Sequence, residues 1–152
     1  MLELEEFKYE KPISLSDIVD KDGFYITASL PGLLAATATN YGIFFTPYAP
    51  FQIVWVAESH TTAGTDAGAV TLNLEKLTGA TALDSGDLIL NTAFDLKGTA
   101  DTVVSYEGNQ LTKNRQLIEG DRLALKDVGT LTNLAGVCVV VYYKYLGQGH
   151  YA

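Results

Sequence analysis

The chain is divided into short apolar segments that are separated, about every ten to fifteen residues, by Gly, Pro, Asn or Asp. None of these segments keeps a helical period of 3.6 residues for more than two turns, whereas several alternate with the period of two that a strand requires. We therefore expect an all-β fold, a jelly-roll-like β-sandwich of about eight antiparallel strands, with an immunoglobulin-like sandwich as the alternative. The expected strands cover residues 24–30, 37–46, 51–59, 69–77, 87–94, 101–106, 122–126 and 136–146.

The alternation of side chains predicts which residues face the core. In the strand of residues 69–77, the inward face carries Val70, Leu72 and Leu74, and the polar residues between them face solvent, namely Thr71, Asn73 and Glu75. In the last strand, Tyr142 points away from an inward face that carries Val137, Val139, Val141, Tyr143 and Tyr145.

The strand of residues 51–59 is apolar on both faces. A strand of this kind is central in its sheet or lies at a subunit contact. Its tryptophan, Trp55, shares a face with Phe51 and Ile53 in a regular strand, so we expect Trp55 to fill the core between the sheets.

Residues 1–22 differ in composition from the rest, and we expect them to form an extended N-terminal arm before a β-sandwich domain of residues 23–152. The arm holds seven acids and three lysines, so it carries half of the chain's net charge of −8. Arms of this kind order against a partner. Because the chain is acidic and lacks a cluster of Lys and Arg, we expect no nucleic-acid partner.

Two features of the sequence bear on its location. No apolar run reaches the length of a membrane helix, so we expect no membrane partner. The N-terminus lacks the basic start and apolar stretch of a signal peptide, which predicts synthesis in a cytoplasm without export. The single cysteine, Cys138, excludes an internal disulfide, and its apolar surroundings predict a buried side chain.

The residues that carry chemistry are few and scattered. The two histidines, His60 and His150, lie in a Gly/Thr-rich loop and in the C-terminal tail, where a rigid catalytic triad is not expected. The loop acids Asp66, Asp84 and Asp87 lack the spacing of a calcium loop and are better explained as turn formers. No glycine-rich phosphate loop occurs. We therefore expect no enzyme activity, no catalytic or metal-binding residue and no cofactor.

Aromatic residues are the more informative group. The chain has nine tyrosines, and Tyr is enriched at protein interfaces because it combines apolar area with a hydroxyl. The stretch of residues 41–48, together with Phe51, is more aromatic than one small core needs and suggests a subunit contact. The candidate interface residues, in the arm and in the domain, are Leu2, Leu4, Phe7, Tyr9, Ile13, Tyr41, Phe44, Phe45, Tyr48, Phe51 and Tyr142.

Four segments carry a resemblance, namely Ser59–Gly79, Leu90–Ala100, Gly120–Leu125 and Leu131–Val137. Together they resemble small β-sandwich proteins encoded among the structural genes of tailed bacteriophages. The resembling region extends from Phe51 to Tyr145, about two-thirds of the chain, and does not include the arm. It rests on the sequences of turns and strands, not on a catalytic signature.

The resemblance implies a structural role in a virion. The nearest class is the capsid decoration or cement protein, which binds the outside of the phage head, stabilises it and often forms trimers. It implies two partners, the major capsid protein and further copies of the same chain in a homotrimer. The alternative is a tail- or head-fibre-associated adhesin, a carbohydrate-binding module, and a glycan partner is expected only under that alternative.

Overall fold

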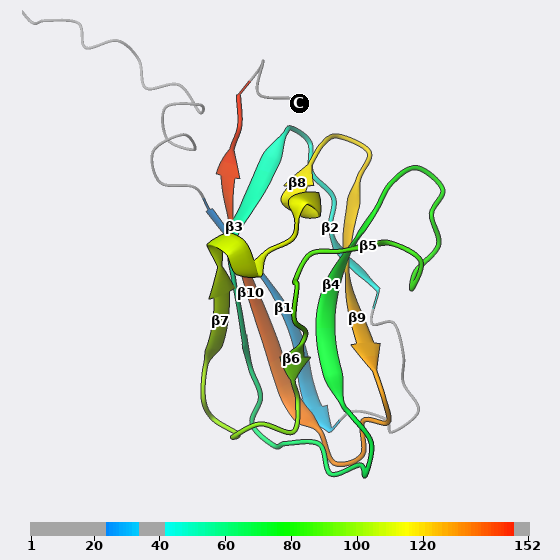
Figure 1. Cartoon of the computed structure of the whole chain (residues 1–152), viewed down its shortest axis with the longest axis vertical. Helices are drawn as coiled ribbons and strands as arrows, with labels where there is room; N and C mark the ends of the chain where they lie inside the picture. The colour runs from blue at the N-terminus through cyan, green and yellow to red at the C-terminus, as the bar shows by residue number, and fades with distance from the viewer. Residues whose placement is uncertain (1–23, 34–41, 148–152) are drawn as a thin grey trace, which may run out of the picture.

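The computed structural model describes residues 24–33 and 42–147, and these form two antiparallel sheets that pack face to face (Figure 1). The all-β prediction is confirmed. The predicted arm, residue Tyr41 and the last five residues, which include His150, lie outside the described residues.

The first sheet, called sheet A, contains in spatial order β1 (Phe24–Leu33), β10 (Ala135–Tyr145), β3 (Phe51–Ser59) and β7 (Val104–Glu107), with β8 (Gln116–Leu117) also paired to β3. The second, sheet B, contains β2 (Ile43–Phe45), β9 (Arg122–Val128), β4 (Thr71–Leu77) and β5 (Asp87–Leu88), with β6 (Phe94–Asp95) also paired to β4. Two short 3₁₀ turns, η1 (Gly108–Gln110) and η2 (Lys113–Arg115), separate β7 from β8.

The strand order identifies the sandwich as a jelly roll. The short strands β5 and β6 follow one another along β4, and β7 and β8 follow one another along β3. When each pair is counted as one interrupted strand, eight strands remain, and the order 1-8-3-6 in one sheet faces 2-7-4-5 in the other. Successive strands alternate between the two sheets, except for the fourth and fifth, which are neighbours in sheet B, and this is the arrangement of a jelly roll.

Asn73 explains why the strand expected over residues 87–94 is interrupted. Its side-chain Nδ2 donates to the carbonyl of Leu90, and its Oδ1 accepts the N–H of the same residue, both over 3.1 Å. The amide therefore replaces the backbone of β4 as the partner of Leu90, and the regular ladder breaks at this point.

The core contains the inward-facing residues that the alternation predicts on β4 and β10. Leu72 and Leu74 are buried, as are Val139, Val141 and Tyr143. The prediction that Asn73 and Glu75 face solvent is wrong, because the chain that follows β4 returns across this face. Asn73 is bonded as described, and Glu75 accepts hydrogen bonds from the backbone N–H groups of Asp84 (2.7 Å) and Gly86 (2.9 Å).

The pairing of β3 with β10 slips by one residue. Tyr142 lies opposite Trp55, whereas Tyr143 lies opposite Ile53, so Val54 is an extra residue in β3. Such a bulge inverts the alternation of all residues beyond it. The prediction that Trp55 fills the core is therefore wrong, and this side chain lies half-buried on the outer face of sheet A.

Candidate interaction surfaces

The bulge brings four side chains into one row on the outer face of sheet A. Tyr25 pairs with Tyr142, Tyr142 with Trp55, and Trp55 with Glu107, so the row crosses all four main strands. Side chains of directly paired residues lie on the same face and contact one another. The row therefore gathers three aromatic rings from β1, β10 and β3 beside a carboxylate from the edge strand β7.

These rings surround a hollow, here called the aromatic cleft, with a volume of about 400 Å³. It is lined by Tyr25, Val54, Trp55, Glu107, Tyr142 and Lys144. The ring of Tyr25, which is 65% exposed, lies perpendicular to Trp55 at 6.4 Å and inclined by 38° to Tyr142 at 4.6 Å. The rings thus form differently oriented walls.

Four hydrogen-bond donors of the aromatic cleft have no partner among the described residues. Across residues 24–33 and 42–147, no hydrogen bond or ion pair engages the Trp55 indole N–H, the Tyr25 and Tyr142 hydroxyls, or the Lys144 ammonium. These are donors that require water or a ligand as their partner.

The rest of the outer face of sheet A differs from the cleft. Two further rows of paired residues carry no charged side chain. One row consists of Thr27, Val140, Ala57 and Ser105, and the other of Ser29, Cys138 and Ser59. The prediction that Cys138 is buried in the core is wrong, because its position in β10 turns it outward with Tyr142. It is half-buried there, and the Ser29 hydroxyl donates to its Sγ over 3.8 Å.

A second apolar surface, here called the β2 edge, consists of Ile43, Phe44, Phe45 and Tyr48. Ile43 and Tyr48 are 44% and 65% exposed, and both phenylalanines are half-buried. The inner side of this surface is anchored to the core, since the Phe45 ring lies 4.7 Å from that of Tyr143. β2 is also an edge strand of sheet B, paired only to β9 among the described strands.

The predicted interface residues therefore separate into different places. Phe44, Phe45 and Tyr48 lie together at the β2 edge, and Tyr142 lies in the aromatic cleft on the other sheet. Phe51 is fully buried in the core, so its side chain offers no area to a partner, and that prediction is wrong. Outside the described residues lie Leu2, Leu4, Phe7, Tyr9, Ile13 and Tyr41.

Sequence reasoning missed two of the three aromatic residues of the cleft, Tyr25 and Trp55. Tyr25 stands in a recognisable strand, but its neighbours come from β10 and β3, which are distant in sequence. A regular alternation in β3 predicts that Trp55 lies on the opposite face, and the bulge at Val54 breaks this alternation. The only signal in the sequence is that β3 is apolar on both faces, and this does not locate the bulge.

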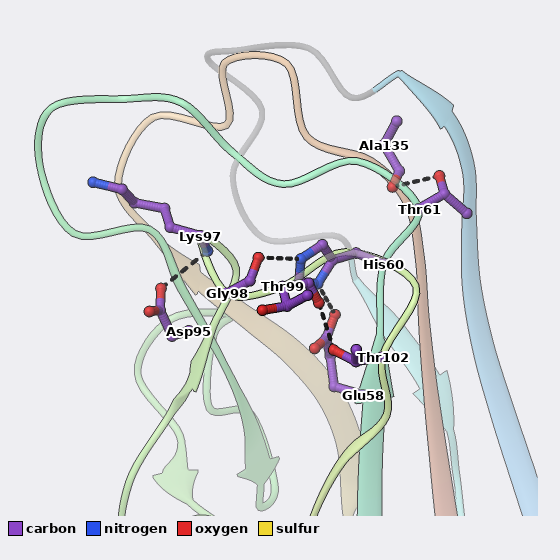
Figure 2. A network of polar contacts seen from close by, with 9 residues as sticks. All are labelled: Glu58, His60, Thr61, Asp95, Lys97, Gly98, Thr99, Thr102 and Ala135. Atoms are coloured by element: carbon purple, nitrogen blue, oxygen red, sulfur yellow. Dashed lines mark hydrogen bonds and ion pairs between the residues drawn. The ribbon is translucent and has the colours of Figure 1, made fainter.

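Beyond the bulge, the inverted alternation turns Glu58 and His60 inward, and they form a buried pair at the end of β3 (Figure 2). Their exposed fractions are 1% and 3%, and the Glu58 Oε1 lies 2.9 Å from the His60 Nδ1. Burial of the carboxyl raises the pKa of Glu58 above its ordinary value of 4.5, and the hydrogen bond and charge interaction with His60 act in the opposite direction.

The pair connects β3 to the loop that follows β6. The His60 Nε2 lies 3.3 Å from the carbonyl oxygen of Gly98 (Figure 2). The backbone N–H of Asp101 donates to the His60 carbonyl over 2.8 Å. Both ring nitrogens of His60 thus have partners inside the protein. A substrate does not reach this imidazole, so the geometry indicates a structural clamp and not a catalytic base.

The loop acids also have local structural roles. The Asp66 carboxylate accepts the backbone N–H of Gly68 over 3.1 Å, and Asp84 forms an exposed ion pair of 3.1 Å with Lys126. Among the residues that the structure describes, no group of three or more His, Cys, Asp or Glu side chains is arranged to hold a metal ion. The described part of the chain also contains no helix long and apolar enough to cross a membrane.

Comparison with known proteins gives a match in structure only. No protein-family model and no curated protein sequence matches the chain. A chain in the structure of the capsid of Ralstonia phage GP4 aligns with a TM-score of 0.59 and 11% sequence identity, over 83% of this chain and 86% of that one. A chain of the cyanophage Pam1 capsid asymmetric unit aligns with a TM-score of 0.50 and 16% identity, over 80% of this chain and 81% of that one.

In both matches the covered shares of the two chains are nearly equal, so each matched chain is close in length to this one. At these identities the matches show the fold alone. The fold is thus a small all-β sandwich that is also found in chains of two phage capsid structures.

Proposed function

We propose that the chain is a structural protein of a phage virion, of the capsid decoration or cement class, which binds and stabilises the head as a homotrimer. The observation that carries this proposal is the similarity of about four-fifths of the fold to chains of similar length in two phage capsid structures. It agrees with the resemblance of the sequence to small structural phage proteins. The protein is made in the host cytoplasm, lies on the capsid exterior and acts without catalysis.

In this proposal residues 1–22 form the arm that contacts the major capsid protein, and the remaining residues form the β-sandwich domain. The apolar arm residues Leu2, Leu4, Phe7, Tyr9 and Ile13 make the contact. A weak contact of this kind is sufficient, because many identical contacts on a repeated lattice, or three arms of one trimer, add their effects as avidity.

The β2 edge supplies the contact between copies. It has the composition of an interface centre, with exposed side chains from Ile43 and Tyr48 and a half-buried ring from Phe44. It is also the edge of sheet B, where exposed strand backbone favours association with another chain. Tyr41, two residues before Ile43 in the sequence, is proposed as a further member of this contact.

Two measurements test the proposal. Light scattering on a sizing column is expected to give three times the chain mass of 16.4 kDa, and Tyr48→Lys is expected to give monomers. Val103→Lys is the control, because Val103 is 70% exposed and lies outside the β2 edge. A mass that Tyr48→Lys leaves unchanged contradicts the assignment of the contact.

Binding to the head is tested by co-sedimentation with empty capsids of the phage that encodes the chain. The full chain is expected to co-sediment in a saturable way, and a chain lacking residues 1–22 is expected to stay in the supernatant while its circular dichroism remains that of a β protein. Binding that survives the deletion refutes the role of the arm. Absence of binding by the full chain refutes the decoration function.

A further inference from the structure

We propose that the aromatic cleft is a carbohydrate-binding site that takes one pyranose unit of a neutral glycan. The site lies on sheet A, whereas the proposed contacts for virion assembly lie in the arm and at the β2 edge of sheet B. The inference therefore adds a second activity, recognition of a glycan, to the proposed structural role.

The shape of the cleft favours a small ligand. Its volume of about 400 Å³ lies in the range of roughly 300–1,000 Å³ that small-molecule sites occupy. Such sites are lined mainly by apolar and aromatic side chains with a few polar groups. The cleft matches this description, since Tyr25, Trp55 and Tyr142 line it and Glu107 and Lys144 provide the charged groups.

The chemistry of the cleft favours a sugar among small ligands. A pyranose presents a face of C–H groups, which packs on an aromatic ring, and a rim of hydroxyls, which both donate and accept hydrogen bonds. The three rings provide aromatic walls, and the unused donors are those of Trp55, Tyr25, Tyr142 and Lys144. A ligand that satisfies these donors while it covers the rings uses both properties of the site.

The charge of the cleft points to a neutral sugar. One carboxylate, from Glu107, and one ammonium, from Lys144, line the cleft, so its formal charge is balanced. A phosphorylated or multiply acidic ligand requires an excess of cationic groups, which the lining does not supply.

A protein partner on the same face is less well supported. A stable protein interface buries about 800 Å² on each side and depends on large anchor residues near its centre. Beyond the cleft, the outer face of sheet A carries small side chains such as Thr27, Ala57 and Ser105. The large side chains of the described part of this face are concentrated around the hollow, which suits a ligand of the size of the hollow.

Trp55 is the only tryptophan in the chain, so its fluorescence reports directly on the cleft. The purified chain is titrated with short oligosaccharides of glucose, galactose, mannose, rhamnose and N-acetylglucosamine, each up to about 10 mM, where millimolar affinity approaches saturation. At least one of these is expected to change the Trp55 emission in a saturable way. If none does so, the proposal is overturned.

The variants Tyr25→Ala and Tyr142→Ala are each expected to weaken binding of that sugar by about tenfold, which corresponds to the loss of one ring contact. Tyr48→Ala is the matched control, because Tyr48 is exposed to the same extent as Tyr25, at 65%, but belongs to the β2 edge. Its affinity is expected to stay unchanged. Equal affinities for all three variants and the unmodified chain overturn the site.

The capsid co-sedimentation described above separates this inference from the proposed function. Tyr25→Ala and Tyr142→Ala are expected to bind capsids as the unmodified chain does. If they lose capsid binding and no sugar binds, the cleft is a protein contact and the carbohydrate site is refuted, while the decoration function stands. If capsid binding fails but a sugar binds through Tyr25 and Tyr142, the decoration function is refuted and the site stands.

Discussion

Removal of the His60 side chain tests the interpretation of the buried Glu58–His60 pair as a structural clamp. In His60→Ala, the Glu58 carboxyl, 1% exposed, loses the partner that lies 2.9 Å away. Leaving one buried polar group without a partner costs about 1–3 kcal/mol. The lost hydrogen bond to the Gly98 carbonyl contributes about 1 kcal/mol more. We expect His60→Ala to lower the free energy of unfolding by about 3 kcal/mol at neutral pH.

The loss is expected to depend on pH with a defined sign. Burial raises the pKa of Glu58 above its ordinary value, so the folded carboxyl holds its proton at pH values where the unfolded carboxyl has released it. Its contribution to stability is therefore fully present below the unfolded pKa and is lost as pH rises through the folded pKa. Without His60, the two interactions that lower this pKa disappear, so the pKa of the folded carboxyl is higher still. The contribution of Glu58 to stability then keeps falling up to a higher pH. The destabilisation by His60→Ala is thus larger at pH 8 than at pH 5.

The assay is urea unfolding of both chains at pH 5 and pH 8, followed by circular dichroism. Glu58→Gln is the matched control, because the amide keeps a hydrogen-bonding group beside His60 but has no proton to release. In the Glu58→Gln background, the effect of His60→Ala is expected to be smaller, because no carboxylate is left there without its partner. A loss below about 1 kcal/mol, or an equal loss at both pH values in the Glu58 chain, refutes the clamp.

Three further substitutions test the fold. Gly129 has a φ of +100°, and a Cβ at this position overlaps the carbonyl oxygen of Ala69, so Gly129→Ala is expected to lower stability by about 2–4 kcal/mol in urea unfolding; an unchanged midpoint contradicts this backbone geometry. Asn73→Ala leaves both backbone groups of Leu90 without their partner and is expected to cost about 2–3 kcal/mol and to accelerate hydrogen exchange of the Leu90 amide. Slow exchange at Leu90 in that variant argues against the bridging role of Asn73. Phe94 is fully buried, and Phe94→Ala is expected to cost about 3–5 kcal/mol in thermal or urea unfolding, whereas a cost below about 1 kcal/mol is incompatible with its place in the core.

Much of the fold was accessible from local sequence patterns. The inward faces of β4 and β10 follow from strict alternation, as Leu72 and Val139 illustrate, because the side chains of a strand change face at every residue. The jelly-roll prediction rested on the number and spacing of short strands and on the absence of a helical period. The strand order 1-8-3-6 against 2-7-4-5 agrees with it.

The candidate sites were accessible only in part. Tyr142 was expected on the outer face because its parity differs from that of Tyr143, and it lies there. Glu75 shows the opposite case, since it alternates as a solvent-facing residue but is fully buried, with the backbone of Asp84 and Gly86 as its partners. Which loop covers which face of a sheet is a tertiary property that alternation does not contain.

The sequence by itself determined where strands form and, in regular strands, which side chains share a face, because both depend on the backbone geometry of neighbouring residues. Tertiary structure alone decided the bulge at Val54, and with it the outward position of Trp55 and the inward positions of Glu58 and His60. A bulge depends on how β3 fits against β10, a strand about eighty residues further along the chain. The aromatic cleft and the buried pair both follow from that one register slip, and only the paired strands define it.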